Sequence, residues 1–317
     1  MTDLCNFRCH YCMPPDGVPK LKHEDVLRLE ELAAVVRLLV TRRQIHKVRI
    51  TGGEPLIRRG LPLFLEQLNA LPQIADLSLT TNGYFLAEMA HLLRHNGVQR
   101  VNVSLDTLRA DRFEATTGVD GLARVLRGIA AARRAGLKPI KLNAVVMRST
   151  LDEIADLLRF SLKHDLTIRF IELMPSHRTW NDEFVPLAEM LRCLTREVPL
   201  DPLASDSNPR AAHPSSRPSG ITSRAARLYR IRGTDAMCGF IAPVSNPFCA
   251  QCDRLRLRGD GTLVPCLADV HGINLKPYLR PHLEPEALLR FIDQQVRASK
   301  AAAPQERRIR TMSQIGG

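Results

Sequence analysis

The chain has 317 residues, 44% of them hydrophobic, which exceeds an ordinary single domain unless the chain forms a barrel, so we expect one barrel with an appendage. Six of the eight cysteines fall into two metal-like triads, and the sequence has no apolar signal segment, which predicts a cytoplasmic protein with reduced thiols. No apolar run reaches the roughly 18 residues that span a membrane, which predicts a soluble protein. The formal charge of +12 suits a nucleic acid or a polyanionic small molecule, but aromatic residues at 5% weaken the case for base stacking.

The first triad is Cys5, Cys9 and Cys12, spaced C-x3-C-x2-C. A structural zinc site normally closes with four protein ligands, so three thiolates favour an iron–sulfur cluster that leaves one iron open. The alternatives are a zinc knuckle completed by His10 or a distant residue, and thiols without any metal. The spacing resembles the signature of radical S-adenosylmethionine (SAM) enzymes. That resemblance implies that SAM occupies the open iron and is cleaved to a 5'-deoxyadenosyl radical, which abstracts a hydrogen atom from the substrate.

Between residue 24 and about residue 198, apolar runs rich in β-branched residues alternate with amphipathic helices, which is typical of βα units around a parallel sheet. The expected strands are His46 to Thr51, Leu77 to Thr81, Arg100 to Leu105, Ile140 to Met147 and Thr167 to Met174. The expected helices are Glu31 to Thr41, Phe85 to His95, Leu122 to Ala135 and Leu151 to His164. The fold class is therefore α/β, a partial (β/α)6 TIM-like radical SAM barrel by resemblance.

Five expected strands are one fewer than that barrel requires. In the radical SAM family a first strand precedes the cysteine triad, and only Thr2 and Asp3 of its usual residues remain in this sequence. We therefore expect the first strand to be missing, a truncated N-terminus, and an exposed sheet edge.

Polar and glycine-rich segments follow the expected strands, where the loops of a barrel build its active site. Gly52-Gly53-Glu54-Pro55 comes first; two glycines allow a close backbone approach, and an ordinary turn is the alternative. Turn formation and helix capping are equally good explanations for the polar residues after the next strands. The resemblance implies four SAM contacts, which are Tyr11, Gly53, Ser104 and Met174.

The remaining chain divides at a segment rich in Pro, Ser and Arg. We expect the barrel over residues 1–200, a flexible linker or loop over 201–224, and a C-terminal region over 225–317 that carries a helix from about Pro285 to Arg297. This region holds the second triad, Cys249, Cys252 and Cys266. His271 could complete a zinc site with these three cysteines. Cys193 and Cys238 have no motif partner and are expected to be core or surface thiols.

The segment from Phe248 to Arg258, followed by Asp260-Gly261 and Cys266-Leu267, closely resembles the C-terminal cluster motif of the GTP 3',8-cyclase family of molybdenum cofactor biosynthesis. The resemblance extends from Thr2 to the end Arg-Thr-Met-Ser-Gln-Ile-Gly-Gly. It implies a lyase with two 4Fe-4S clusters, of which the second binds the guanine of GTP. It also implies GTP contacts from Arg49, Thr80, Lys141, Arg254, Leu255 and Arg256, and a supporting role for Gly316 and Gly317.

Simple chemistry is consistent with several of these assignments. Arg254, Arg256 and Arg258 alternate along an expected strand, so they share one face, and guanidinium groups suit a triphosphate. Lys141 interrupts an apolar strand and needs an anionic partner such as phosphate, unless it reaches solvent at the rim.

Three alternative functions stay open. The chain could be a radical SAM peptide-modifying enzyme with an auxiliary cluster, a basic zinc protein that binds nucleic acid, or a truncated and inactive relative. The preferred interpretation predicts GTP as substrate, a reducing electron donor, a cyclic pyranopterin synthase as the next enzyme, a homodimer by family resemblance, and neither membrane nor nucleic acid as partner.

Overall fold

The computed structural model describes residues 1–13, 21–175, 180–203, 225–249, 252–267 and 272–301, and the descriptions below concern these residues. Their main feature is an eight-stranded sheet in the order β1-β2-β3-β4-β5-β8-β7-β6. Its strands are β1 Lys47–Ile50, β2 Asp76–Thr81, β3 Arg100–Ser104, β4 Ile140–Val146, β5 Thr167–Glu172, β6 Leu200–Pro202, β7 Arg227–Ile231 and β8 Met237–Ile241. Strands β1 to β5 and β8 run parallel, while β7 and β6 add an antiparallel edge.

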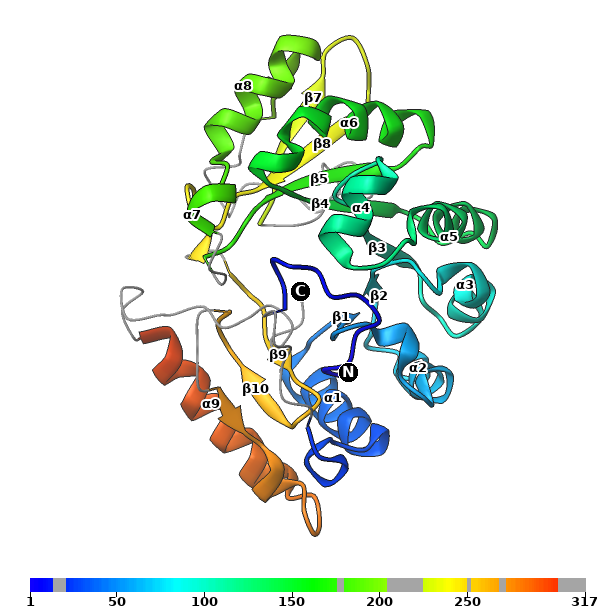
Figure 1. Cartoon of the computed structure of the whole chain (residues 1–317). Coiled ribbons are helices and arrows are strands. Elements are labelled where there is room, and N and C mark those ends of the chain that lie inside the picture. Colours follow the sequence, from blue (N-terminus) through cyan, green and yellow to red (C-terminus); the bar gives the residue numbers. More distant parts are fainter. Residues whose placement is uncertain (14–20, 176–179, 204–224, 250–251, 268–271, 302–317) are drawn as a thin grey trace.

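The sheet is strongly curved, and helices line its outer side (Figure 1). These helices are α1 Leu29–Arg43, α2 Leu61–Asn69, α3 Leu86–His95, α4 Ala110–Thr117, α5 Leu122–Arg134, α6 Ile154–Lys163, α7 Trp180–Glu183 and α8 Leu187–Glu197. This arrangement confirms the expected α/β fold with a partial TIM-like barrel. In the part of the chain that the structure describes, no helix is long and apolar enough to cross a membrane.

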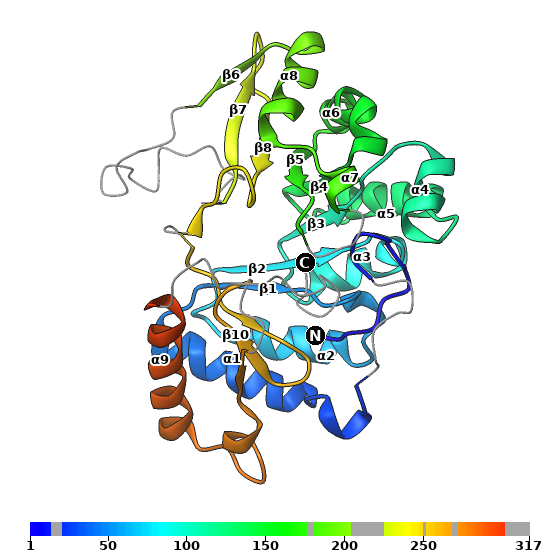
Figure 2. The same cartoon turned by 60° about the vertical axis from the view of Figure 1, so that its left-hand side comes forward.

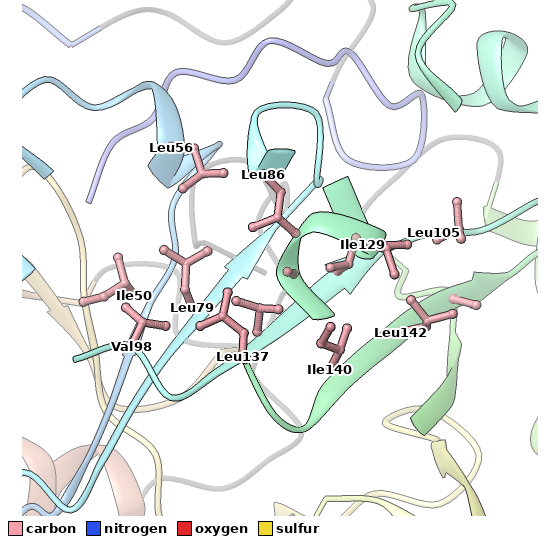
Figure 3. Close-up of a cluster of buried hydrophobic side chains, with 14 of the residues drawn as sticks. Ile50, Leu56, Leu79, Leu86, Val98, Leu105, Ile129, Leu137, Ile140 and Leu142 are labelled. Atoms are coloured by element: carbon pink, nitrogen blue, oxygen red, sulfur yellow. The ribbon is translucent and has the colours of Figure 1, made fainter. Parts of the chain in front are cut away.

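The outer face of the sheet carries the hydrophobic core. Leu79 and Leu142 are fully buried between the strands and the helices, together with Leu86 of α3 and Ile129 of α5 (Figure 3). Strand residues alternate between the two faces, so the neighbours of these leucines point to the inner side of the curved sheet. Those neighbours are largely polar, so polar side chains line the barrel interior, and it is not a second apolar core.

The sixth parallel strand, β8, was not expected from the sequence and follows residues 204–224, which lie outside the described part of the chain. The expected linker at 201–224 also begins inside β6. The division of the chain into domains stays a prediction, but the barrel sheet draws residues from both sides of that segment.

Strand β1 stands at the edge of the sheet, as expected, and the first residues of the chain bind the loop that follows it. The α-amino group of Met1 donates to Thr51 O at 2.9 Å, Gly53 N donates to Thr2 O at 2.7 Å, and Glu54 N donates to Leu4 O at 2.8 Å. The N-terminal segment thus pairs with the loop that follows β1.

A smaller unit packs beside β1 and α1 (Figure 2). It contains the antiparallel strands β9 Arg256–Leu257, β10 Thr262–Val264 and β11 Ile273–Asn274, and helix α9 Pro285–Ala301, which contains the expected Pro285 to Arg297 helix. Backbone and ionic contacts join it to the barrel: Leu27 N donates to Gly259 O at 2.7 Å, and Arg280 pairs with Glu31 of α1 at 2.7 Å. These contacts place the second cysteine triad against the barrel.

Candidate active site

The first cysteine triad lies on a loop held across the barrel mouth. Arg8 N donates to Thr117 O at 2.8 Å and His10 N donates to Thr116 O at 3.1 Å, so the loop is attached to the C-terminal end of α4. Phe7 is buried and packs edge-on against Tyr84 and Phe113, with ring centroids 5.8 and 5.7 Å away. An apolar anchor and two backbone bonds therefore fix the loop that carries the thiols.

The two glycines after β1 are required by this loop. A Cβ atom on Gly52 would lie 2.6 Å from Thr2 O, and one on Gly53 would lie 2.1 Å from Leu4 O. Both distances are far below van der Waals contact with backbone atoms that cannot move aside. The close approach expected at this motif is thus made by the chain's own N-terminal segment, and a contact of Gly53 with SAM stays a prediction.

Glu54 connects the mouth loops to one another. Its fully buried carboxylate accepts hydrogen bonds from Leu56 N, Thr81 Oγ1 and Asn82 N at 2.9, 2.8 and 2.7 Å. Burial raises the pKa of Glu54 to about 7, although these three donors favour the charged form. The Asn82 side chain in turn donates to Asn6 Oδ1 at 2.9 Å, beside Cys5.

The three thiols interact electrostatically with one another. Burial raises the pKa of Cys9 well above its ordinary value and that of Cys12 to about 12, and the neighbouring thiols and Asp106 add to both shifts. Cationic iron would relieve this cost, because metal binding requires the thiolate form. The all-sulfur donor set, partly buried at the barrel mouth, therefore fits an iron–sulfur cluster.

Among the described residues, no three His, Cys, Asp or Glu side chains are grouped closely enough to hold one metal ion.

The barrel interior is polar and strongly cationic. Register places Thr80, Asn102 and Lys141 side by side, with Asn143 and Arg169 in the next layer. Asn102 Nδ2 donates to Thr80 Oγ1 at 3.1 Å, and the Arg169 guanidinium donates to Asn102 Oδ1 at 2.8 Å and to Asn143 Oδ1 at 3.0 Å. Lys141 and Arg169 are only 3% and 4% exposed, so two charged groups are held almost out of water.

The cations in this interior repel one another. Burial lowers the pKa of Lys141 to about 7, and Arg169, Arg100 and Arg49 lower it further by their charge. The pKa of Arg49 is lowered by burial and by Arg254, and that of Arg169 by burial and Arg49. Asp76, paired with Arg100, is the carboxylate that counters Arg49 and Lys141. An excess of buried positive charge marks this space as an anion site.

The second triad borders the same space. Cys249 is exposed, while Cys252 and Cys266 are partly buried and both raise the pKa of nearby Arg256, which burial and Arg254 lower. The strand expected over Arg254 to Arg258 is wrong in extent, because β9 contains only Arg256–Leu257. Arg258 also differs from Arg256, since it pairs with Asp260 at 2.9 Å. The Arg254 guanidinium stacks 5.5 Å from the Phe248 ring.

The structure thus brings together Arg49, Thr80, Lys141, Arg254 and Arg256 from distant parts of the sequence, and Leu255 packs against the core beside them. Gly53, Ser104 and Met174 lie at or just after the C-terminal ends of strands, and Tyr11 donates a hydrogen bond to Asp106, which comes after β3. Gly316, Gly317 and His271 lie outside the described residues. Arg169 was missed, although a charged residue in the apolar run Ile168-Arg169-Phe170 carried the same signal that singled out Lys141.

Comparison with protein families agrees with this architecture. Residues 1–161 match the family described as the radical SAM superfamily, and residues 166–303 match the family described as Molybdenum Cofactor Synthesis C. The structure of Streptococcus suis SuiB bound to S-adenosylmethionine superposes with a TM-score of 0.62 over 95% of this chain and 64% of SuiB, at 15% identity. The curved sheet and the cysteine loop at its mouth are those of a radical SAM protein.

Sequence relatives define the group more closely. The GTP 3',8-cyclases of Geobacter sulfurreducens and Moorella thermoacetica are 42% and 41% identical to this chain over its whole length and 95% of their own. The chain therefore belongs to the GTP 3',8-cyclase family of radical SAM enzymes. Membership of this family entails 4Fe-4S clusters and SAM as its cofactors, in agreement with the two cysteine triads.

Proposed function

We propose that this chain converts GTP to (8S)-3',8-cyclo-7,8-dihydroguanosine 5'-triphosphate in molybdenum cofactor biosynthesis. The observation that carries the proposal is the buried cation cluster inside the barrel, which extends to the second cysteine triad. Bound SAM supplies the 5'-deoxyadenosyl radical that removes the ribose 3' hydrogen before that carbon joins guanine C8. The protein's own task is to bind, orient and enclose the nucleotide.

The triphosphate suits the interior cations. Arg49 repels Lys141 and Arg169, and Arg254 and Arg256 in turn repel Arg49, which lowers the pKa values within this group. A polyanion would remove this repulsion, and forked guanidinium groups can bind phosphate oxygens in pairs. We infer that Arg49, Lys141, Arg254 and Arg256 contact GTP, and we add Arg169 to them.

Thr80 and Leu255 occupy different positions in this arrangement. Thr80 stands on the inner face, and its hydroxyl accepts a hydrogen bond from Asn102, which leaves its proton for the substrate. Leu255 separates the two arginines and gives the nucleotide an apolar neighbour. Both residues are proposed GTP contacts.

SAM binding belongs at the carboxyl ends of the strands. Tyr11 lies in the first triad, Gly53 beside Leu4, Ser104 at the end of β3, and Met174 just after β5. Parallel strands bring their carboxyl ends to one edge of a barrel, so these residues converge on the mouth where the first cluster belongs. Cys5, Cys9 and Cys12 would hold that cluster, and Cys249, Cys252 and Cys266 the second.

The location of the charge favours a small polyanion over nucleic acid. Lys141 and Arg169 are buried inside the barrel, where a duplex or an extended strand cannot reach them. Proteins that bind nucleic acid through charge present it on their surface. The basic zinc protein therefore becomes the weaker of the two interpretations.

The experiment is anaerobic reconstitution followed by metal analysis and a GTP assay with SAM and dithionite. We expect about eight irons per chain, as two four-iron clusters require, and formation of the cyclised nucleotide. Cys9→Ala should lose SAM cleavage, whereas Cys252→Ala should keep SAM cleavage and lose the cyclised product. Zinc in place of iron in a well-folded protein, with no absorption near 400 nm, would refute the radical mechanism.

Partners beyond GTP belong to the proposal as well. Each turnover needs two electrons, one to cleave SAM and one, with a proton, to reduce the nucleotide radical that remains after the 3',8 bond has formed, so a reducing electron donor must serve the protein. A cyclic pyranopterin synthase as the consumer of the product, a homodimer, and a cytoplasmic location complete the proposal.

A further inference from the structure

Asp106 joins the barrel sheet to the first cysteine loop. It lies two residues after the end of β3 and is only 7% exposed. The ladder between β3 and β4 ends where Leu105 N donates to Asn143 O at 2.9 Å. Asp106 Oδ1 then accepts from Val145 N at 2.8 Å, so its side chain takes the place of the next backbone acceptor. The carboxylate is thereby fixed to the sheet.

The second oxygen of Asp106 reaches the cysteine loop. Asp106 Oδ2 accepts the hydroxyl proton of Tyr11 at 2.7 Å. Tyr11 stands between Cys9 and Cys12 in the sequence, and its side chain is near enough to Cys9 to lower the pKa of that thiol. One carboxylate therefore ties β4 to the middle of the triad without touching a cysteine sulfur.

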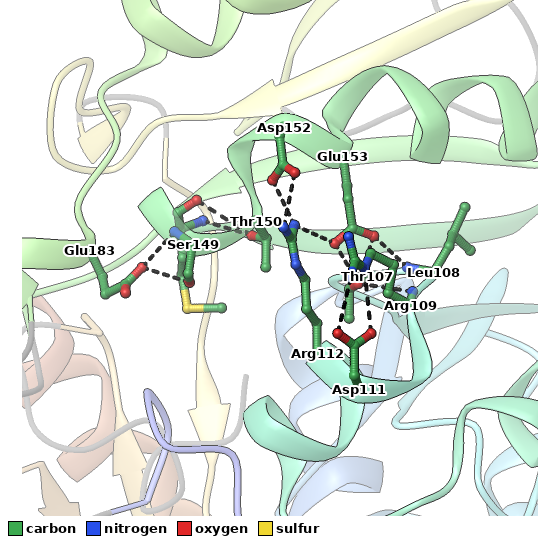
Figure 4. Close-up of polar contacts among 11 residues, drawn as sticks. Thr107, Leu108, Arg109, Asp111, Arg112, Ser149, Thr150, Asp152, Glu153 and Glu183 are labelled. Atoms are coloured by element: carbon green, nitrogen blue, oxygen red, sulfur yellow. Dashed lines mark hydrogen bonds and ion pairs between the residues drawn. The ribbon is translucent and has the colours of Figure 1, made fainter.

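A second buried carboxylate, Glu153, secures the segment that carries Asp106 (Figure 4). Glu153 accepts from Thr107 Oγ1 at 2.7 and 2.8 Å and from Leu108 N at 3.0 Å. It also pairs with Arg112 of α4 at 2.8 Å. The residues immediately after Asp106 are thus clamped to the turn before α6.

Helix α4 carries the same support to the other side of the triad. Arg112 anchors its first half to Glu153 and Asp152, the latter at 2.6 Å. Its last carbonyls, those of Thr116 and Thr117, receive the amides of residues 10 and 8. The cysteine loop is consequently held at two points, both of which lead back to Glu153.

We propose that Asp106 is a positioning residue that sets the pose of the first cluster loop through Tyr11, and that Glu153 fixes the segment from which Asp106 acts. The inference rests on the proposed role of Cys5, Cys9 and Cys12. Three thiolates determine whether a cluster is held. The loop backbone sets the positions of these thiols, and a cluster held by them would meet SAM in a pose that depends on those positions.

The test compares Asp106→Asn, Tyr11→Phe and the double variant with Asp111→Asn. Asp111 lies in α4 only five residues from Asp106, but its partner Arg109 and its own side chain are more than half exposed, so its loss should be nearly neutral. Each protein is reconstituted and assayed for iron, for the Michaelis constants of SAM and GTP, and for the potential of the reduced-cluster signal that responds to SAM.

For Asp106→Asn we expect full iron content, a SAM Michaelis constant raised at least tenfold, and a GTP constant within twofold of the parent. The potential of the SAM-responsive cluster should become more positive, because a negative charge has been removed beside it. Tyr11→Phe should raise the SAM constant with a smaller change in potential, and the double variant should be no worse than the more impaired single variant. Glu153→Gln should show the same selective loss for SAM, and Asp111→Asn should match the parent.

A SAM constant and a cluster potential unchanged in Asp106→Asn, while the parent cleaves SAM, would overturn this inference alone. Additive effects of Asp106→Asn and Tyr11→Phe would also overturn it, because the two residues would then act separately. A parent protein that holds no cluster on its first triad would overturn the proposed function, and this inference with it.

Discussion

Binding of GTP should be accompanied by uptake of about one proton at Lys141. In the free protein burial and three arginines lower the pKa of Lys141 from 10.5 to about 7, a shift worth about 5 kcal/mol against the charged form. A triphosphate within contact favours the ammonium form and raises that pKa again. The neutral lysine of the free protein must therefore gain a proton when GTP binds above pH 7.

The size of the effect follows from this shift. If bound GTP returns the pKa of Lys141 to its ordinary value, the affinity for GTP falls as the pH rises. It falls in proportion to the fraction of free protein in which Lys141 is still protonated. Between pH 7.5 and 9 this fraction falls by a factor of roughly 25, or about 2 kcal/mol. Near pH 8 the loss of charge falls mainly on Lys141, because the lowered pKa values of Arg169 and Arg49, about 9 and about 10, are still higher.

Without GTP, the free energy of unfolding should rise with pH, whereas the affinity for GTP falls. The folded pKa of Lys141 lies below its unfolded value, so between pH 7 and 10.5 the unfolded chain binds more protons. Stability from this group then rises with pH through that window. The destabilising contribution is fully present below pH 7.

Titration calorimetry in two buffers of different ionisation enthalpy measures the proton count directly, with reconstituted protein and GTP in the absence of SAM. We expect about 0.9 protons per GTP at pH 8, from the free pKa of about 7. Lys141→Arg keeps the charge and should bind with little pH dependence, while Lys141→Met should bind weakly at every pH. Proton uptake that persists in Lys141→Met would show that another group titrates, and equal affinity at pH 7.5 and 9 in the parent would refute the reasoning.

Three further predictions concern the clusters and the fold. Cys252→Ala should lower iron from about eight to about four per chain and leave the SAM-responsive signal intact, which iron analysis and electron paramagnetic resonance measure. Gly53→Ala should abolish stable cluster binding, because its Cβ would stand 2.1 Å from Leu4 O. Gly136→Ala is the control: its Cβ would lie 4.0 Å from Arg94 Nε, so the change should cost only about 1 kcal/mol of backbone strain. Leu79→Ala should lower the free energy of unfolding by about 2 to 5 kcal/mol in denaturant titration, because the side chain is fully buried, and a loss below 1 kcal/mol would contradict the assigned core.

The five strands expected from the sequence are present within one or two residues of the expected bounds, because parallel strands buried on one face leave a strong apolar pattern. Strand β8 escaped prediction for a physical reason. It contains Gly239, which weakens a strand pattern, yet a Cβ there would stand 3.3 Å from Arg169 Cγ. The glycine makes room for a long side chain from the neighbouring strand, and one sequence alone does not contain that relation.

Helix α4 escaped for a similar reason. Two of its last residues, Thr116 and Thr117, have low helix propensity, and the helix is only eight residues long. Tertiary contacts stabilise it: Phe113 packs against Phe7, and the last carbonyls accept amides from the cysteine loop. Local sequence predicts an element well when its own pattern forms it, and poorly when a distant segment completes it.

The candidate site shows the same division between local and distant information. Cysteine spacing and strand-end motifs could be interpreted residue by residue, since each is a local pattern with its own chemistry. The cation cluster could not, because Arg49, Lys141 and Arg169 come from three strands and meet only when the sheet curves. Their mutual repulsion costs folding free energy in the empty barrel, and a bound polyanion offsets it. We therefore expect GTP to stabilise this protein more strongly than guanosine does, because only the phosphates of GTP would relieve the repulsion among these buried cations.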